Sequence, residues 1–519
     1  MPVHYLLSST RYVRFSESEK GSVMTPCQAH TEMVSSFELI DDLLGGTARM
    51  REVGERWMPR EPNELVNQYR LRLSRSFLFN ALRDTLDNLV SRPFSRKTTV
   101  KPDPSEDDVL EDMVNDMDLE GSNLTNFAKD VFEIGSTYGI AYILTDYPVT
   151  SSEGTPTLAE ERSEKIRPYF TAYRPHDVIG WKSERMKNGK RRMTQVRLIE
   201  HRDESESPAT FDTKEVKYVR VISMNETGVG GTWQLFRQGE KSLEAAGQGT
   251  HTFDEIPLDV VYFKKRRDAK VRYMRGEPPL QDLAEMNLCH WHSSSDQRNA
   301  LRFTRFGMLV QTGVSLEEAK KPVTVGPGYV FRSTEPTATF SFCESSGDGV
   351  AVGENDLKRI EERMELLGLR PLVEATSNST ATGKTIDENK TETAIQLWVR
   401  AVEEGISSAF RRAFKMMARD EPEGFAIDIF SDFSTLLPDP TILTFLQGMR
   451  TGGDLSRVTF LEEVKRRGIL SPSVDPEAEA EEAANDAPLL PNPFGDPKAD
   501  PDNPKPDPTG KPPFPSATS

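Results

Sequence analysis

The most regular pattern in the chain is a run of amphipathic stretches between residues 278 and 417. The first begins at Pro278-Pro279, where a missing N–H costs no helical hydrogen bond, and extends to about Arg302. It predicts a helix roughly 34 Å long at 1.5 Å per residue. Its apolar positions share one face and are Leu280, Leu283, Met286 and Trp291.

Two further helices are predicted downstream. One extends from Asp356, the expected N-cap, to Gly368, with apolar residues at 3-4-3 spacing: Leu357, Ile360, Met364 and Leu367. The other is a long helix over residues 392–420, whose expected apolar face consists of Ala394, Leu397, Val402, Ile406 and Phe410.

The chain before residue 278 mixes helical and strand patterns. Helices are predicted over residues 64–92, ended by Pro93, and over residues 124–135, followed by an apolar strand over residues 140–144. The 64–92 helix is expected to use Tyr69, Leu73, Phe77, Leu82, Leu86 and Val90. Strand signals fill residues 169–263, with a hairpin at Asn188-Gly189. Strands and helices do not alternate regularly, so the prediction is an α+β fold with mostly antiparallel pairing.

A compact insert separates the first two long helices. Met308 to Val310 predicts a strand, and Ser315 to Glu318 reads as a capping box that opens a short helix. Gly326-Pro-Gly328 predicts a turn into a second strand over Tyr329 to Phe331.

Between the second and third helices lies a Ser/Thr/Asn/Gly-rich stretch, Glu374 to Asn389. Short polar residues favour a mobile backbone over a packed core. The whole connection between the predicted helices is roughly twenty residues, longer than most helix-to-helix connections, although an ordinary connection is the alternative. Connections of this length within compact proteins are usually functional or disordered.

Several of these segments resemble one family. Pro278-Pro-Leu-Gln-Asp-Leu-Ala-Glu-Met-Asn-Leu, Phe306-Gly-Met-Leu-Val and Ile360-x-x-x-Met-x-x-Leu-Gly368 are similar to the portal proteins of tailed bacteriophages, in a branch characterised mainly by a domain of unknown function. Phe132 to Pro148, Arg167 to Tyr173 and Ile256 to Leu258 fit the same branch, and Ile427 to Phe433 and Gly453 to Ser456 resemble portals more widely. The resemblance covers about residues 35 to 470, and it rests on the order and spacing of the pieces.

The resemblance implies a portal fold with a wing, stem helices, a small α/β clip, a long kinked helix and a helical crown. The implied boundaries are a flexible extension 1–24, wing 25–277, first stem helix 278–302, clip 303–352, second stem helix 353–370, tunnel loop 371–391, long wing helix 392–420, C-terminal wing and crown 421–470, and disordered tail 471–519.

The resemblance also implies the functional residues. The tunnel loop would face DNA through Ser377, Asn378, Ser379, Thr380, Thr382, Lys384, Thr385 and Lys390. The clip would face the terminase and then the head-tail adaptor through Arg305, Gln311, Lys320, Lys321, Tyr329 and Arg332.

Charge argues against a protein that grips nucleic acid over a broad surface. The 519-residue chain has a formal net charge of −17, whereas phosphate affinity comes from Lys and Arg. Residues 471–519 contribute −7 and contain 13 of the 35 prolines, so this tail is expected to be disordered. Residues 1–23 are expected to be poorly ordered, as a flexible arm or an extension from an upstream start.

The three cysteines, Cys27, Cys289 and Cys343, lie far apart, as expected of a reducing compartment. No apolar run reaches the 18 or so residues that a membrane span requires, and the start lacks a secretion signal. The expectation is a protein of the host cytoplasm during assembly and of the virion afterwards, without a membrane partner.

Candidate catalytic and metal motifs are incomplete. Ala381-Thr-Gly-Lys-Thr385 resembles the end of a phosphate loop, but Asn378 stands where the motif requires glycine, and a helix rather than a strand precedes it. Adjacent helical positions face different ways, so Cys289-His290-Trp291-His292 is not expected to bind one ion. Trp291 is expected to be buried or to contact another subunit. The remaining histidines lack a Cys or Asp partner at catalytic spacing: His4, His30, His176, His201 and His251. No cofactor, metal or enzymatic activity is predicted.

One basic cluster departs from the acidic balance: Lys264 to Arg267 with Lys270, Arg272 and Arg275. Two interpretations stay open. It is either a solvated strand end or a contact for an acidic neighbouring subunit, a shell protein or nucleic acid.

The function that these patterns favour is a portal protein at one capsid vertex, a channel for DNA packaging and ejection. The resemblance implies a head-to-tail ring of twelve copies. Its expected partners are double-stranded DNA passing without sequence specificity, terminase, the head-tail adaptor, and the major capsid protein or scaffold. The alternatives are another head-tail structural or adaptor protein, which would usually be shorter, and a nucleic-acid enzyme, which would need clustered carboxylates or a nucleotide motif.

Overall fold

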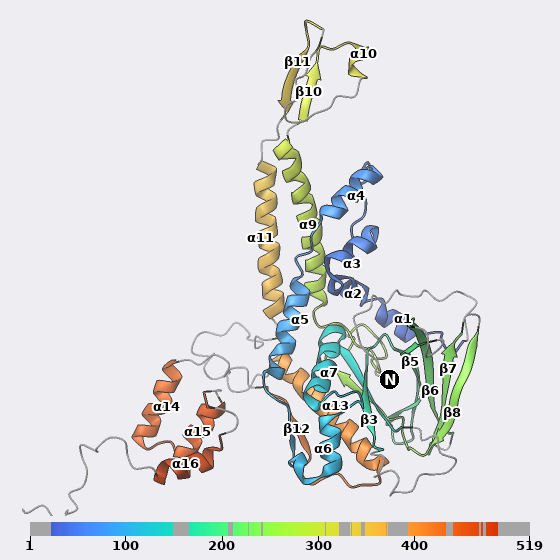
Figure 1. Cartoon of the computed structure of the whole chain (residues 1–519), viewed down its shortest axis with the longest axis vertical. Helices are drawn as coiled ribbons and strands as arrows, with labels where there is room; N and C mark the ends of the chain where they lie inside the picture. The colour runs from blue at the N-terminus through green and yellow to red at the C-terminus, as the bar shows by residue number, and fades with distance from the viewer. Residues whose placement is uncertain are drawn as a thin grey trace, which may run out of the picture. The chain divides into compact units, whose positions relative to one another are not determined.

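The computed structural model describes residues 22–148, 166–205, 211–226, 228–239, 242–306, 308–320, 333, 335–343, 348–369, 371, 393–431, 440–466, 469–470 and 474–485 (Figure 1). The chain divides into two compact units, residues 1–431 and 432–519. The fold is α+β, as predicted.

The core of the first unit is a three-stranded sheet. β2 (Ile140–Asp146) lies between β3 (Tyr169–Tyr173) and β9 (Leu258–Tyr262), and both pairings are antiparallel. β2 is a nearly continuous apolar run and is buried over Ile140 to Thr145. This pattern is typical of a strand that is covered on both faces. α7 (Leu124–Tyr138) and the long α13 (Ala394–Met416) pack on this sheet.

A five-stranded antiparallel meander forms a second sheet in the order of the chain. Its strands are β4 (Val178–Arg185), β5 (Arg191–Glu204), β6 (Lys214–Met224), β7 (Gly231–Gln238) and β8 (Leu243–His251). The predicted hairpin at Asn188-Gly189 is confirmed, with Gly189 at φ +81°, a left-handed conformation that glycine adopts without a steric penalty. Every strand pair in the described part of the chain is antiparallel, as predicted.

The beginning of the described chain is held by this sheet. Met24 is buried against Ile179 and Val219, and the Arg197 guanidinium donates to the Val23 and Thr25 carbonyls at 2.8 and 2.7 Å. Met24, which was expected to belong to a flexible extension, is therefore held in place, and residues 1–21 lie outside the described residues. α1 (Gln28–Val34), α2 (Glu38–Leu44) and α3 (Gly46–Val53) follow, and then a 3-10 turn, η2 (Gly54–Arg56).

The predicted helix over residues 64–92 is wrong as a single element. It is two helices, α4 (Val66–Arg75) and α5 (Ala81–Ser91). The chain turns extended at Ser76, whose carbonyl accepts two hydrogen bonds from Arg51, and Asn80 caps α5 by accepting from the Arg83 amide. Phe77, expected on the buried face, is consequently exposed.

The remaining small elements of the first unit close one end of the body. Strand β1 (Thr99–Lys101) pairs with β12 (Ala426–Asp428), which brings two distant parts of the sequence into one ladder. The connecting elements are η3 (Pro93–Ser95), η4 (Pro104–Glu106) and α6 (Asp108–Asn115).

The second unit contains α14 (Pro440–Gly452), α15 (Arg457–Arg466) and α16 (Pro476–Asn485). α15 starts after Ser456, which accepts a hydrogen bond from the Thr459 amide. The structure differs from the expected disorder at α16, because Pro476 at the first position and a run of Glu and Ala favour a helix, which contacts α15. Residues 486–519 lie outside the described residues.

Candidate functional site

The candidate site begins with two antiparallel helices, α9 (Gln281–Phe306) and α11 (Asp348–Leu369). The Gln297 side-chain amide donates to the Val350 carbonyl at 2.7 Å, and His290 Nε2 lies 3.1 Å from a Glu361 carboxylate oxygen. These two contacts define the register. Ile360 and Met364 are buried in this pair, as the 3-4-3 spacing predicts.

Both helix boundaries differ from the prediction. α9 begins at Gln281 rather than at the prolines, because the Leu280 carbonyl accepts the first helical hydrogen bond, from Ala284. α9 also continues past Arg302 to Phe306. α11 begins at Asp348, well before Asp356, so Asp356 lies within the helix and is not its N-cap. The extension is stabilised by α9, since residues 350–353 pack beside Gln297.

A small antiparallel sheet joins the far ends of these helices. β10 (Met308–Thr312) pairs with β11 (Thr339–Cys343), and α10 (Leu316–Ala319) follows β10 (Figure 1). β10 and α10 confirm the predicted strand and short helix. β11 was not predicted, and the predicted strand over residues 329–331 lies outside the described residues.

Three of the six predicted clip residues are described. Arg305 is exposed in the last turn of α9, Gln311 is on β10 opposite Phe340, and Lys320 is exposed directly after α10. Lys321, Tyr329 and Arg332 lie outside the described residues. The same is true of all eight predicted tunnel-loop residues: Ser377, Asn378, Ser379, Thr380, Thr382, Lys384, Thr385 and Lys390.

The connection that holds the tunnel-loop residues ends at a firmly capped helix. The Thr393 hydroxyl accepts from the Gln396 amide while the Gln396 side chain accepts from the Thr393 amide, a complete capping box. The Gln396 side chain also donates to the Ser431 carbonyl at 3.0 Å. The start of α13 is thus fixed in conformation and in place.

The buried face of α13 is partly different from the predicted one. Leu397 is exposed, whereas Trp398 is buried and packs near Phe132 and Phe263, with ring centroids 6.4 and 5.6 Å apart. The larger aromatic side chain thus occupies the core side. Val402, Ile406 and Phe410 are buried as predicted, and α13 is assigned as one uninterrupted helix.

Charged pairs anchor the other end of α13 to β9. Arg412 contacts Asp259 and Glu255, each at 2.9 Å, and the Ser408 hydroxyl donates to Asp259 at 2.6 Å. Burial lowers the pKa of the Arg412 guanidinium, but the two carboxylates outweigh burial and raise the pKa above its ordinary value. Lys415 adds a contact with Asp254 at 2.7 Å.

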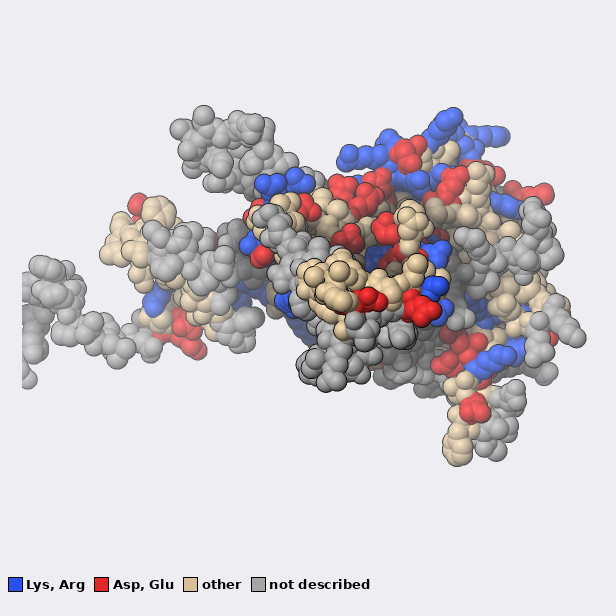
Figure 2. Space-filling model, turned by 90° about the horizontal axis from the view of Figure 1, so that it is seen from above, with Lys and Arg blue, Asp and Glu red and all other residues tan. Residues whose placement is uncertain are grey.

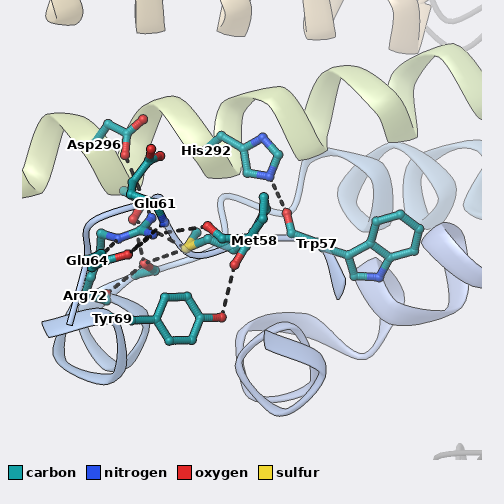
Figure 3. A network of polar contacts seen from close by, with 11 residues as sticks. Trp57, Met58, Glu61, Glu64, Tyr69, Arg72, His292 and Asp296 are labelled. Atoms are coloured by element: carbon teal, nitrogen blue, oxygen red, sulfur yellow. Dashed lines mark hydrogen bonds and ion pairs between the residues drawn. The ribbon is translucent and has the colours of Figure 1, made fainter. Parts of the chain in front are cut away.

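A polar network attaches α4 and the residues before it to α9 (Figure 3). Arg72 binds Glu64 through two hydrogen bonds of 2.8 Å and lies 3.9 Å from Asp296 of α9. The Tyr69 hydroxyl donates to the Met58 carbonyl at 3.0 Å, and His292 contacts the Trp57 carbonyl. The hydrogen bond to Arg72 lowers the pKa of Glu64 and raises the pKa of Arg72.

The Cys-His-Trp-His cluster does not converge, as predicted. His290 faces α11, His292 faces Trp57, Trp291 is fully buried and Cys289 is exposed. Within the described residues, no three His, Cys, Asp or Glu side chains are grouped closely enough to hold a metal ion. No described helix combines the length and apolar character needed to cross a bilayer.

Two of the other histidines contact acidic side chains in space, although neither was predicted to have a Cys or Asp partner at catalytic spacing along the chain. His176 lies 3.0 Å from Asp41, and His201 contacts Asp177 and Glu215. Asp41 and His176 are far apart in the sequence, so spacing along the chain could not reveal this pair. The clusters lie within the body of the first unit and tie its elements together.

The basic cluster at 264–275 is largely engaged within the chain. Lys264 pairs with Glu277 at 2.7 Å, Arg275 with Glu32 at 3.1 Å, and Arg266 with Asp268 at 2.7 Å. Lys265 lies over the Tyr262 ring, with its amine 4.4 Å from the centroid. These contacts attach the segment to Glu32 of α1 and to Glu277, which lies shortly before α9.

Known proteins offer one domain family and several distant structures for comparison. A family model, DUF4055, a domain of unknown function, matches residues 279–419, about a quarter of the chain. That match begins at α9 and ends just after α13, so it contains the helix pair, the small sheet, the connection and the long helix. Among curated proteins, nothing matches the sequence.

Solved structures from gene transfer agent particles match most of the chain at low similarity. A chain from the virion of the native particle is 11% identical, with a TM-score of 0.36, over 76% of this chain and 90% of that chain. A chain from the neck of the empty particle is 10% identical, with a TM-score of 0.37, over 76% of this chain and 90% of that chain. A chain from the neck of the native particle, computed with C12 symmetry, is 10% identical, with a TM-score of 0.36, over 83% of this chain and 98% of that chain.

Proposed function

We propose that this chain is a portal protein, the subunit of a ring of twelve at one vertex of a phage-like capsid. The observation that carries the proposal is the order of elements over residues 279–419. An antiparallel helix pair bears a small sheet at its far end and leads, through the connection over residues 370–393, to a long helix seated on the central sheet. The sequence resemblance to portals rests in part on the same segments.

In this proposal the protein conducts DNA and performs no chemistry. The α9 and α11 pair is the stem, the β10 and β11 sheet is the clip, and residues 371–391 form a tunnel loop between two fixed helices. The DNA-facing residues would be Ser377, Asn378, Ser379, Thr380, Thr382, Lys384, Thr385 and Lys390. Of these, Lys384 and Lys390 would touch phosphate transiently, and a separate terminase ATPase would supply the force. A conduit should bind DNA weakly, which agrees with a net charge of −17.

The clip is the proposed docking site for terminase and then the adaptor. Arg305, Gln311 and Lys320 sit at or beyond the end of α9, and Lys321, Tyr329 and Arg332 belong to the same insert. Replacing Lys320, Lys321 and Arg332 by glutamate should weaken adaptor or terminase binding while rings persist. Unchanged binding would remove the clip from this role.

The decisive experiment measures the mass and symmetry of the purified chain. The particle should have twelve times the 58.4 kDa mass of the monomer, and electron microscopy should show a central channel. A stable monomer in the presence of capsid and scaffold proteins would overturn the proposal. The preparation should not hydrolyse ATP, and an activity that disappears in Lys384→Ala would contradict the conduit mechanism.

A second experiment tests the tunnel loop. Replacing residues 377–385 by two glycines should leave rings intact and impair packaging or retention of DNA. A matched control replaces the same residues by a Gly/Ser segment of equal length, which removes Lys384 without shortening the loop. Normal packaging by the shortened loop would refute the assignment.

A further inference from the structure

Helix α9 is covered on two opposite sides, by α4 on one side and by α11 on the other (Figure 1). His290 and Gln297 face α11, whereas Ser295 and Asp296 face α4. At about 100° per residue these two sets lie about half a turn apart on α9. The three helices therefore form a layered block with two outer surfaces.

The first outer surface is residues 65–79, which include α4 and the extended segment after it. This stretch contains three arginines and no lysine, aspartate or glutamate. Leu71 is 46% exposed and Phe77 53% exposed, and the Arg298 guanidinium lies 6.0 Å from the Phe77 ring centroid. Arginine and aromatic residues without lysine or carboxylates are the composition of a protein–protein interface.

Arginines continue this surface onto α9. Arg75, Arg298 and Arg302 line one small pocket between α4 and α9. Within the described part of the chain, none of the three has a carboxylate within salt-bridge distance, whereas Arg72 beside them is paired with Glu64. Like charges gathered in this way favour an acidic surface opposite them.

The second outer surface is the far side of α11. Ile360 and Met364 are buried toward α9, but Leu366 follows Met364 at about 200° around the helix and is 62% exposed. Val352 precedes Leu366 by roughly four full turns, so it is exposed on the same side. A helix with apolar residues on both faces is suited to lie between two neighbours.

We infer that the 65–79 surface of one copy docks on the far side of α11 of the next copy. Both surfaces lie beside the same length of α9, since Ser76 contacts Ser295 while Val350 and Glu361 contact Gln297 and His290. A rotation about an axis along the helices would bring them together. The inference rests on the proposed ring.

Charge favours the same pairing. Residues 65–79 contribute +3, of which Arg72 is already paired with Glu64, and α11 as a whole has a balance of −3, of which Glu361 faces α9. The face of the molecule seen from above carries basic and acidic side chains beside one another, not one continuous basic field (Figure 2). This mixture suits a protein neighbour better than nucleic acid. Because the two surfaces differ, the contact is heterologous and repeats around a closed ring.

The test uses the full chain with one exposed leucine changed on each surface. Leu71→Glu and Leu366→Glu should each convert the twelve-subunit ring into species near the 58.4 kDa monomer in mass photometry. Val229→Glu, at another exposed apolar residue on the β6–β7 turn, is the matched control and should keep rings. Circular dichroism should show the same folded state for all three variants.

Mixing the two variants separates a heterologous contact from a general loss of solubility. Each variant keeps one intact surface, so the mixture should form dimers of twice the monomer mass but no rings. Rings that persist in both variants would overturn the inference, and so would a mixture that stays monomeric. In either case the proposed function still stands if the wild-type chain forms a ring. Intact rings with reduced DNA retention in Leu71→Glu would instead assign the 65–79 surface to nucleic acid. A wild-type chain that forms no ring would refute the proposed function itself.

Discussion

Helices α13 and α4 each contain three arginines, yet the side chains of the two helices find partners in different ways. α13 buries ten residues against the central sheet, and its Arg412 has two carboxylates within 2.9 Å. α4 buries Tyr69 alone, leaves Leu71 exposed and ends at Arg75, which has no carboxylate partner among the described residues. The first helix finds its partners within its own chain, whereas the second leaves apolar and arginine side chains exposed, and we infer that a neighbouring copy covers them.

The largest expected effect comes from the core side of this comparison. Phe410→Ala should lower the free energy of unfolding by about 3–5 kcal/mol, because a fully buried ring would leave a cavity. Its ring lies 4.9 Å from that of Phe170 and 5.3 Å from that of Phe425. Urea unfolding of an assembly-deficient monomer measures this loss. Phe77→Ala in the same background should change stability by less than about 0.5 kcal/mol, and comparable losses would erase the distinction.

Arg412→Met should cause the next largest loss in the free energy of unfolding, about 3 kcal/mol. This is the lower end of the loss expected when one partner of a buried ion pair is removed. It leaves the buried Asp259 without its guanidinium, although Ser408 still donates to the carboxylate and limits the loss. Arg75→Met should have no measurable effect on the monomer and should weaken ring assembly. The comparison between α13 and α4 would be wrong if Arg75→Met destabilised the monomer and Arg412→Met did not.

The body should also show a pH dependence that comes from a buried histidine. Burial lowers the pKa of His30 from 6.5 to about 4, so the folded state holds the neutral imidazole while the unfolded chain takes up a proton below pH 6.5. Stability should therefore fall by about 2–3 kcal/mol as pH drops from 7 to 4, beyond the loss in His30→Gln. Thermal unfolding of both proteins across this range gives the difference, and parallel curves would contradict it.

His201 provides a control with the opposite sign. The hydrogen bond to Asp177 is the main cause that raises the pKa of His201 above 6.5, so its contribution to stability is fully present below pH 6.5 and is lost as pH rises through the higher folded value. The stability difference between wild type and His201→Gln should therefore shrink toward alkaline pH. A difference that grows there would reverse the assignment.

The smallest effect is expected from the C-terminal residues. Truncation after Asn485 should leave both the unfolding midpoint and the ring mass unchanged, because residues 486–519 are Pro-rich and acidic. Truncation after Leu470 also removes α16 and the contact of Lys465 with the Val474 carbonyl, so it should lower the stability of the second unit slightly. Loss of rings in either truncation would show that the tail takes part in assembly.

The sequence predicted long elements well because their patterns are local. The apolar spacing of α9, α11 and α13 and the apolar run of β2 all correspond to observed elements. Breaks and ends were less predictable. The break at Ser76 depends on Arg51, and the early start of α11 depends on Gln297, and neither partner is near in sequence.

The candidate site was predictable in its order and not in its contacts. β11 has five residues and an ordinary Thr-Phe-Ser-Phe-Cys alternation, and its role is defined only by pairing with β10. The pairing of Asp41 with His176 and that of Asp259 with Arg412 join residues 135 and 153 positions apart. The exposure of Leu71 and Leu366 could not be predicted either, because the sequence does not distinguish an apolar residue that faces solvent in one copy from a core residue.

The double anchoring of α13 has a mechanical consequence. Its first turn is locked by the Thr393 and Gln396 box and tied to Ser431, and its last turns are tied to β9 through Arg412 and to Asp254 through Lys415. The helix is thus a rod of about 34 Å, held at both ends. A pull along the axis from the first turn of α13 would pass through Arg412 and Asp259 into β9, and from there into the hydrogen bonds between β9 and β2.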